Sequence, residues 1–279
     1  MPDRDNHVVF LHGACKHHLG YENCWWDAIR AGCDDLAEFE VTGIQWNPLY
    51  HHHPIKDCEC FPEGWVDIRQ DQGERDVAHF LFNSVFATAA IEQCTRVIEA
   101  LSGNVNIHII AHSLGTVVGY RALHELSKNN IQVKTFTTVG SVLAWQAFQL
   151  SNFVHVGREH GRLRRPNTES WLNIMDQDDW VFKTNEQVIW RSYHHLGKDE
   201  GGPDRERSKP GVNQGVQCSE LEWPKKDEII DWDLDILRLS IPREEMCTHL
   251  AYFHQNSQAR ELIHSHLTGK TGTASNKQS

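Results

Sequence analysis

A serine that follows a strand-like run is the residue of this chain whose neighbours best suit chemistry. The apolar run of residues 105–110 leads into Ser113, and Ala111 and Gly115 stand two positions before and after that serine. A sharp strand-to-helix turn needs small residues at these two places, because strand, turn and helix approach one another closely there. The pattern predicts a nucleophile elbow, with the serine at the first turn of a helix. The alternative is an N-cap serine followed by a glycine tolerated for packing.

A serine hydroxyl is a poor nucleophile near neutral pH, so it needs a histidine as base and an acid that orients the histidine. On a strand-elbow scaffold the chain order is serine, acid, histidine. Asp176, Asp178 and Asp179 follow the strand-like run of residues 171–175. We favour Asp179, because Asp176 at the strand tip is placed to cap a turn. Asp176 is the main rival, and three solvated turn residues are the remaining alternative.

The base is expected after the last strand, for which residues 236–240 are the candidate. The histidines that follow are His249, His254, His264 and His266. His249 lies between that strand and a helix expected from about residue 257 to 267, on a loop able to reach the elbow. His264 and His266 lie on the expected amphipathic helix itself. Because a lone histidine is more often a core or surface residue, the case for a base depends on the ordered set of three.

Strand-like and helix-like runs alternate along the chain, which is the pattern of a parallel sheet with covering helices. Strands are expected at residues 7–11, 41–46, 105–110, 133–139, 171–175 and 236–240, and helices at 25–36, 89–101, after Ser113 and at 257–267. The sequence predicts an α/β fold, with a mostly parallel sheet of about six strands and helices on both faces. Residues 1–267 are expected to form one domain with inserted loop or cap segments at about 47–75 and 195–225. A disordered tail is expected over residues 268–279.

Composition excludes several classes of partner. Lys and Arg total 27 against 38 Asp and Glu, and the formal charge of −11 disfavours binding to nucleic acid. No apolar run approaches the roughly 20 residues that cross a bilayer, and the start of the chain resembles no signal peptide. We therefore expect no transmembrane segment and a cytoplasmic location. Most of the eight cysteines are then expected to be free thiols.

Two groups of residues contain good zinc ligands. One combines His51, His52 and His53 with Cys58 and Cys60, and the other combines His12, Cys15, His17 and His18. Neither has the paired CxxC or HxxxH spacing that makes a metal site specific, so no metal or cofactor is expected, and a metal site is a second hypothesis. A catalytically silent binding module is a third, because fold does not imply function. Four tryptophans, Trp25, Trp26, Trp46 and Trp145, are candidates for an acyl pocket or for ordinary core packing.

Five ordered motifs carry a resemblance to a known family. They are His12-Gly13 after the first strand, the elbow at 111–115, residues 138–141, residues 172–174 leading to 178–181, and residues 248–253. Together they resemble the serine hydrolases of the α/β-hydrolase superfamily, particularly its lipase and esterase-like members. The resemblance favours Asp179 and His249 as acid and base, and it implies an oxyanion hole formed by the backbone N–H groups of Leu114 and Ala14. A small-molecule or lipid carboxylic ester is the implied substrate, with thioesters and amides as alternatives. Substrate-binding residues and oligomeric state stay unspecified.

Overall fold

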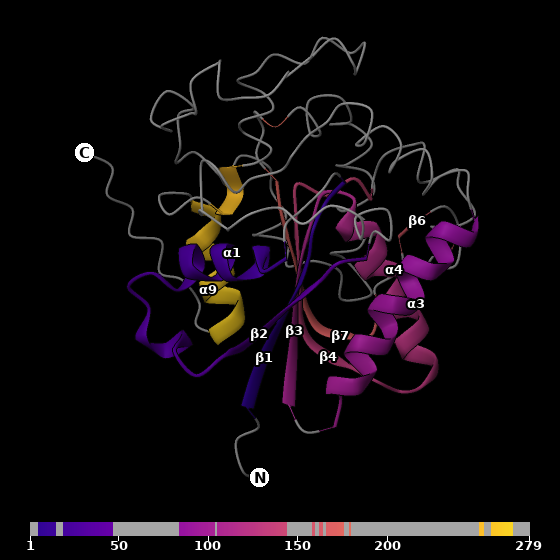
Figure 1. The fold of residues 1–279 in the computed structure, drawn as a ribbon, viewed down its shortest axis with the longest axis horizontal. Coiled ribbons are helices and arrows are strands. Elements are labelled where there is room, and N and C mark those ends of the chain that lie inside the picture. The colour runs from indigo at the N-terminus through magenta and orange to yellow at the C-terminus, as the bar shows by residue number, and fades with distance from the viewer. Residues whose placement is uncertain are drawn as a thin grey trace.

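A five-stranded parallel sheet forms the centre of the fold (Figure 1). The computed structural model describes residues 5–14, 19–46, 84–103, 105–143, 158–159, 162–163, 166–175, 179, 251–253 and 258–269. The strands are β1 (Asp5–Leu11), β2 (Glu40–Ile44), β3 (Val105–His112), β4 (Val133–Val139) and β7 (Thr168–Ile174). Their order is β2-β1-β3-β4-β7, and every neighbouring pair is parallel. The expected parallel α/β sheet is confirmed.

Some expected segments lie outside the described residues. These are the sixth strand at 236–240, the insertions at 47–75 and 195–225, and the tail after Gly269. The described residues add one short antiparallel ribbon, formed by β5 (Arg158–Glu159) and β6 (Arg162–Leu163). No helix of the described segments is both long and apolar enough to cross a membrane.

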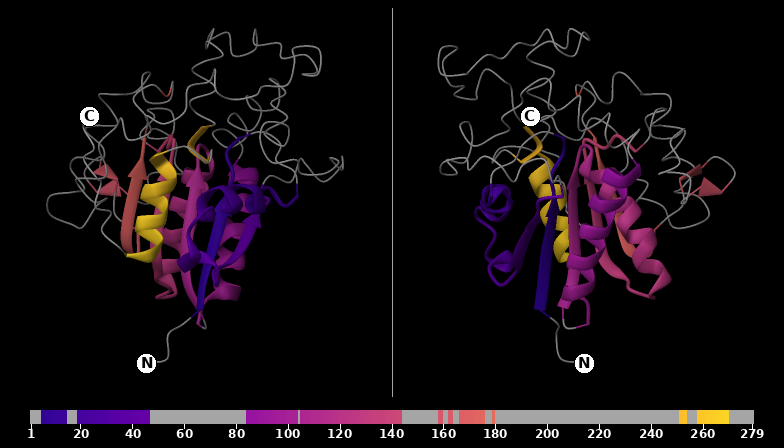
Figure 2. Two further views of the ribbon diagram at one scale, coloured as in Figure 1. Left: turned by 90° about the vertical axis from the view of Figure 1, so that its left-hand side faces the viewer. Right: turned by 45° about the vertical axis from the view of Figure 1, so that its right-hand side comes forward.

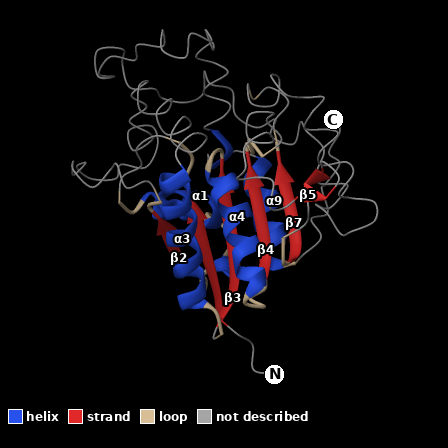
Figure 3. Ribbon diagram, turned by 90° about the vertical axis from the view of Figure 1, so that its right-hand side faces the viewer, coloured by secondary structure: helices blue, strands red, loops and turns tan. Residues whose placement is uncertain are grey.

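Helices cover both faces of the sheet. α3 (Ser84–Leu101) and α4 (Gly115–Lys128) lie on one face, whereas α1 (Tyr21–Arg30) and α9 (Gln258–Thr268) lie on the other (Figures 2 and 3). Two 3-10 turns, η1 (Asp34–Leu36) and η5 (Ala251–Phe253), accompany the second pair. The helix expected at 25–36 ends earlier, because Gly32 has a left-handed φ of 76° that stops it.

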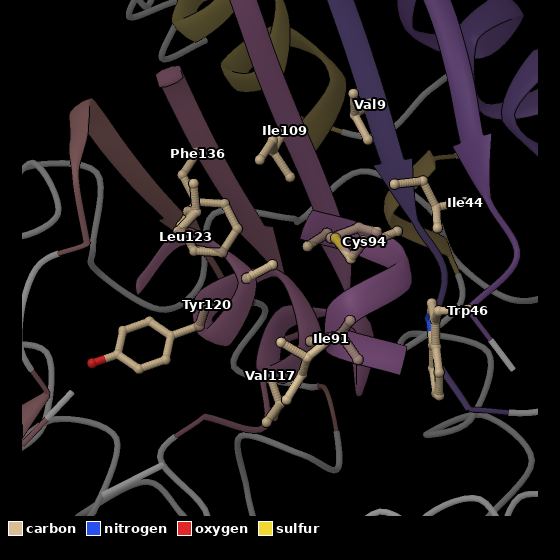
Figure 4. Close-up of a cluster of buried hydrophobic side chains, with 14 of the residues drawn as sticks. Val9, Ile44, Trp46, Ile91, Cys94, Ile109, Val117, Tyr120, Leu123 and Phe136 are labelled. Atoms are coloured by element: carbon tan, nitrogen blue, oxygen red, sulfur yellow. The ribbon is translucent and has the colours of Figure 1, made fainter. Parts of the chain in front are cut away.

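The core is divided between the two faces of the sheet. Val9 and Ile109 point toward α3 and α4, in the cluster drawn in Figure 4. Val8 and Ile110, their neighbours in sequence, belong to the cluster under α1 and α9. Successive side chains of a strand point to opposite faces, so a strand covered on both sides is apolar throughout. This explains why Ile109, Ile110 and Ala111, just before the elbow, are all apolar.

Cysteine chemistry differs among the described residues. Cys33 and Cys94 carry free thiols, as the sequence suggested for most of the cysteines. Cys24, which is buried in α1, is disulfide-bonded instead. Burial also raises the pKa of the Cys94 thiol. Cys94 is therefore an unreactive core residue of α3.

Candidate active site

Ser113 forms the turn between the end of β3 and the start of α4. Its φ is 50°, a left-handed conformation that few non-glycine residues adopt. Its N–H donates to the carbonyl of Val139 at the end of β4 (3.0 Å). Its own carbonyl accepts hydrogen bonds from the backbone N–H and the hydroxyl of Thr116, at 3.0 and 2.6 Å. The N-cap of α4 is Leu114, so the alternative of an N-cap serine does not hold.

The tight packing around the elbow explains which of its neighbours must be glycine. A Cβ on Gly115 would lie 2.6 Å from the carbonyl oxygen of Leu11, where α4 passes over the end of β1. A Cβ on Gly13 would lie 2.8 Å from the Cβ of Ser113 and 3.3 Å from its Oγ. Ala111, by contrast, is an alanine packed in the core cluster under α3 and α4. Gly13 and Gly115 are thus the positions where only a missing side chain allows the approach.

Two segments of backbone lie beside Ser113, namely the start of α4 and the loop after β1. The N–H groups of Leu114 and Gly115 lie at the start of α4, where no carbonyl of the preceding turn can accept them. The loop after β1 brings Gly13 against Ser113, and Ala14 follows it while packing on the core cluster of α4. The amino end of a helix also carries a partial positive charge. The start of α4 beside Ser113 is therefore the positive end of the helix dipole.

His12 fixes the loop that carries Gly13 and Ala14. Its ring is fully buried, stacks on Trp46 (centroids 5.0 Å apart, planes 15° apart), and meets the ring of Tyr21 edge-on. The indole N–H of Trp46 donates to the His12 carbonyl at 2.8 Å, and His12 Nδ1 lies 2.7 Å from the carbonyl of Gly13. Burial lowers the pKa of His12 to about 4, although its bond to the Gly13 carbonyl acts in the opposite direction. The ring is therefore neutral at pH 7, and Nδ1 donates its proton to that carbonyl.

The predicted acid is buried beside the residues that surround the elbow. Asp179 lies beyond the carboxyl end of β7 and is fully buried, and its Oδ2 accepts the hydroxyl of Tyr252 at 2.7 Å. The ring of Tyr252 lies 6.2 Å from the ring of His112, the residue before Ser113. Two rings, those of Tyr252 and His112, thus form a chain of contacts from Asp179 to the residue before Ser113. The rival acids Asp176 and Asp178 lie outside the described residues.

The candidate bases fall into two groups. His249 and His254 lie outside the described residues, on either side of η5. His264 Nε2 lies 2.8 Å from the carboxylate of Asp35 in η1. His266 uses both ring nitrogens, each 2.8 Å from a hydroxyl, with Thr137 in β4 and Ser170 in β7 as partners. These two histidines of α9 therefore hold the helix against η1, β4 and β7. His249 stays the predicted base, and in the sequence it stands two residues before η5.

The remaining sequence hypotheses have mixed outcomes. Trp25, Trp26 and Trp46 are buried among core residues, which agrees with the packing interpretation. Trp145 and the histidines and cysteines of the segment 51–60 lie outside the described residues. Within the described segments, no group of three or more His, Cys, Asp or Glu side chains is placed to hold a metal ion.

Three residues of the candidate site follow three parallel strands of the sheet. The central strand β3 ends in a left-handed Ser113, the loop after β1 packs against that serine, and an aspartate follows β7. This arrangement resembles the core of the α/β-hydrolase fold, in which a nucleophile elbow follows a strand of a parallel sheet. In open α/β sheets of this kind, ligands bind at the carboxyl ends of the strands. Gly13, Ser113 and Asp179 follow the carboxyl ends of β1, β3 and β7, which makes this end of the sheet the candidate site.

Comparison with known proteins yields structural neighbours only. No protein-family model and no curated protein matches the chain by sequence. A dienelactone hydrolase from Anabaena variabilis is 12% identical, with a TM-score of 0.37 over 67% of this chain and 70% of its own. RedJ, a thioesterase from the prodiginine biosynthetic pathway in Streptomyces coelicolor, is 13% identical (TM-score 0.35; 69% and 78%). An Arabidopsis methylesterase is 14% identical (TM-score 0.32; 67% and 84%). Neither substrate nor site residues carry over at this distance, so the fold assignment depends on this chain's own geometry.

Sequence reasoning missed one residue that contacts the site. Tyr252 had no assigned role, although it belongs to the motif of residues 248–253 that includes His249. The signal available in the sequence was a hydrogen-bonding aromatic residue three positions after the proposed base. Its partner Asp179 is 73 residues away, and only the fold shows that the two side chains meet.

Proposed function

We propose that this chain is a serine hydrolase that cleaves a carboxylic ester, with Ser113 as nucleophile, His249 as base and Asp179 as the orienting acid. The observation that carries the proposal is the left-handed Ser113 at the end of β3, with Gly13 packed against its side chain. A strained turn of this kind costs about 1–3 kcal/mol and persists where the surrounding structure imposes it. In a nucleophile elbow, a strained turn of this kind exposes the serine side chain beyond the carboxyl end of its strand, where a substrate can reach it.

The proposed reaction passes through an acyl-enzyme. The Oγ of Ser113 attacks the ester carbonyl carbon while His249 accepts the hydroxyl proton, and the carbonyl oxygen becomes an oxyanion. The C–O bond to the alcohol then breaks, and the proton passes from His249 to the departing alcohol. Water attacks the acyl-enzyme in the same way, which releases the acid and restores the Ser113 hydroxyl.

The oxyanion in this proposal is bound by the backbone N–H groups of Leu114 and Ala14. Support comes from the position of Leu114 at the start of α4 and from Gly13, the residue before Ala14, which packs against Ser113. Buried and neutral, His12 holds this loop without adding a charge. Fixed donors of this kind stabilise the transition state without having to reorganise.

A fluorophosphonate probe tests the nucleophile. We expect covalent labelling of the wild type on Ser113, mapped by peptide mass spectrometry, and none of Ser113→Ala. Ser127→Ala is the matched control, because the Ser127 hydroxyl donates to the carbonyl of Leu123 in the same helix and lies away from the elbow. Equal labelling of the wild type and Ser113→Ala would refute the nucleophile.

Kinetics with p-nitrophenyl esters of increasing acyl length test the base and the substrate class. His249→Ala is expected to lower kcat by several orders of magnitude, and His254→Ala is its paired control. Comparing each ester with the matching thioester and anilide decides which bond is cleaved. Turnover that survives in His249→Ala but is lost in His254→Ala would reassign the base. Absence of turnover on every acyl substrate would favour a silent binding protein.

A further inference from the structure

A buried hydrogen bond connects two segments of the chain that both belong to the proposed site. The hydroxyl of Tyr252 donates to Oδ2 of Asp179 across 2.7 Å, and both residues are completely buried. One segment follows β7 and carries the proposed acid. The other is η5, which begins two residues after the proposed base. A buried carboxylate needs hydrogen-bond donors, because its charge is costly to keep away from water.

The turn that carries Tyr252 is itself held by aromatic contacts. Phe253 stacks on Trp25 of α1 with ring centroids 4.1 Å apart and planes 11° apart. Phe253 also meets the ring of His112 edge-on at 5.8 Å, directly before the elbow. These two contacts of Phe253 hold η5 against α1 and against the residue before Ser113. The Tyr252 hydroxyl therefore extends from a turn that is packed against both of these neighbours.

We propose that Tyr252 is a positioning residue that sets the orientation of the Asp179 carboxylate toward the histidine base. The proposal rests on the proposed function, since it requires Asp179 to be the acid. A carboxylate has about four acceptor positions, so accepting Tyr252 at Oδ2 is compatible with accepting a histidine N–H at Oδ1. By holding Oδ2, the hydroxyl restricts rotation of the carboxylate.

A role in orientation predicts a particular kinetic signature. Hydrogen bonds to charged groups are among the stronger ones, and their loss corresponds to roughly a 10- to 100-fold change in an equilibrium or a rate. We expect Tyr252→Phe to lower kcat by that factor and to leave KM within about twofold, because the hydroxyl acts on the triad rather than on substrate binding. The rate of fluorophosphonate labelling of Ser113 should fall by the same factor. The phenyl ring retains the contact with His112.

Two controls separate positioning from packing. Tyr120→Phe removes the hydroxyl of another buried tyrosine, on the opposite face of the sheet (Figure 4), and is expected to leave kcat unchanged. In an Asp179→Asn background, whose slow labelling is followed over hours, adding Tyr252→Phe should produce little further loss. If the single variant does not fold, this double variant still tests the coupling, because a neutral amide tolerates a missing donor better than a carboxylate.

The outcomes are distinct. A kcat and labelling rate within twofold of the wild type in Tyr252→Phe would overturn the positioning role and leave Ser113 as nucleophile intact. An equal loss in the Asp179→Asn background would also overturn it, because Tyr252 would then act by another route. A wild type that shows no Ser113-dependent labelling would overturn the proposed function and this inference together. A loss confined to the background with an intact Asp179 supports the inference.

Discussion

Gly115 lies directly against the backbone of His12, so that a Cβ at this position would come within 2.3 Å of the His12 carbonyl oxygen. That oxygen is held by the indole of Trp46 and cannot move aside. We expect Gly115→Ala to lower the free energy of unfolding by about 2–3 kcal/mol, measured by urea denaturation. Gly119→Ala, one turn later in α4, mainly meets the movable side-chain tip of Leu11 and is expected to cost less. Equal losses in the two variants would show that the elbow is not tightly packed.

The strain at Ser113 can be measured by comparing two variants that both lack its hydroxyl. Alanine keeps the Cβ that makes a left-handed φ of 50° unfavourable, whereas glycine adopts this conformation freely. We expect Ser113→Gly to be more stable than Ser113→Ala by about 1 kcal/mol in urea denaturation, although glycine is the more flexible residue when unfolded. The reverse order would mean that the turn is unstrained.

Protonation of His12 should destabilise the protein in acid. Its pKa is about 4 when folded and 6.5 as the ordinary value, so between these pH values only the unfolded chain binds the proton. The contribution of neutral His12 to the free energy of unfolding is therefore fully present above pH 6.5 and is lost as the pH falls through 4. The total loss is about 3 kcal/mol, at roughly 1.4 kcal/mol per pKa unit.

His12→Phe, which retains a ring against Trp46, tests this pH dependence. The buried His108, whose pKa burial lowers to about 3, is present in both proteins, as are the carboxylates. The difference in unfolding free energy between wild type and variant, followed from pH 7.5 to 4, therefore isolates His12. Parallel curves for the two proteins would contradict the assignment.

The two histidines of α9 should differ in their effect on stability. His266→Ala removes the partner of two hydroxyls, Thr137 in β4 and Ser170 in β7, and is expected to cost about 2–3 kcal/mol. His264→Ala removes only a partly exposed contact with Asp35 and should change stability by less than about 1 kcal/mol. Thermal unfolding of the two variants side by side provides the check. Similar midpoints would show that α9 is not held through His266.

Local patterns in the sequence predicted the parts of the fold that neighbouring residues determine. The elbow could be identified because Ala111, Ser113 and Gly115 lie within five residues, and the strand before it because both of its faces are buried. The start of α1 was placed too late, at Trp25, because apolar periodicity begins there. The helix starts at Tyr21, an amphipathic residue that buries its ring and donates its hydroxyl to the carbonyl of Phe10.

Contacts between distant segments could not be derived in the same way. Trp46 donates to His12 across 34 residues, and Tyr252 donates to Asp179 across 73. Such pairs depend on strand order and on which residue faces inward, and the residue types alone do not specify either. This is why the sequence left Trp46 open between a pocket residue and a core residue, whereas the fold shows that it supports the loop beside Ser113.

The attachment of α9 through His266 also bears on the order in which the protein matures. Thr137 and His266 are separated by 129 residues, and the layer formed by α1 and α9 includes side chains from both ends of the sequence. During synthesis β1, β3, β4 and α4 emerge first, whereas the apolar face under α9 stays uncovered until residues 258–268 have left the ribosome. A chain interrupted before that point would contain Ser113 and Asp179 but would lack Ala259, Ile263 and Leu267, which complete this core cluster. Among the described elements, α9 is thus the last part of this cluster to be synthesised, and an unfinished chain has an incomplete apolar core of the kind that favours aggregation.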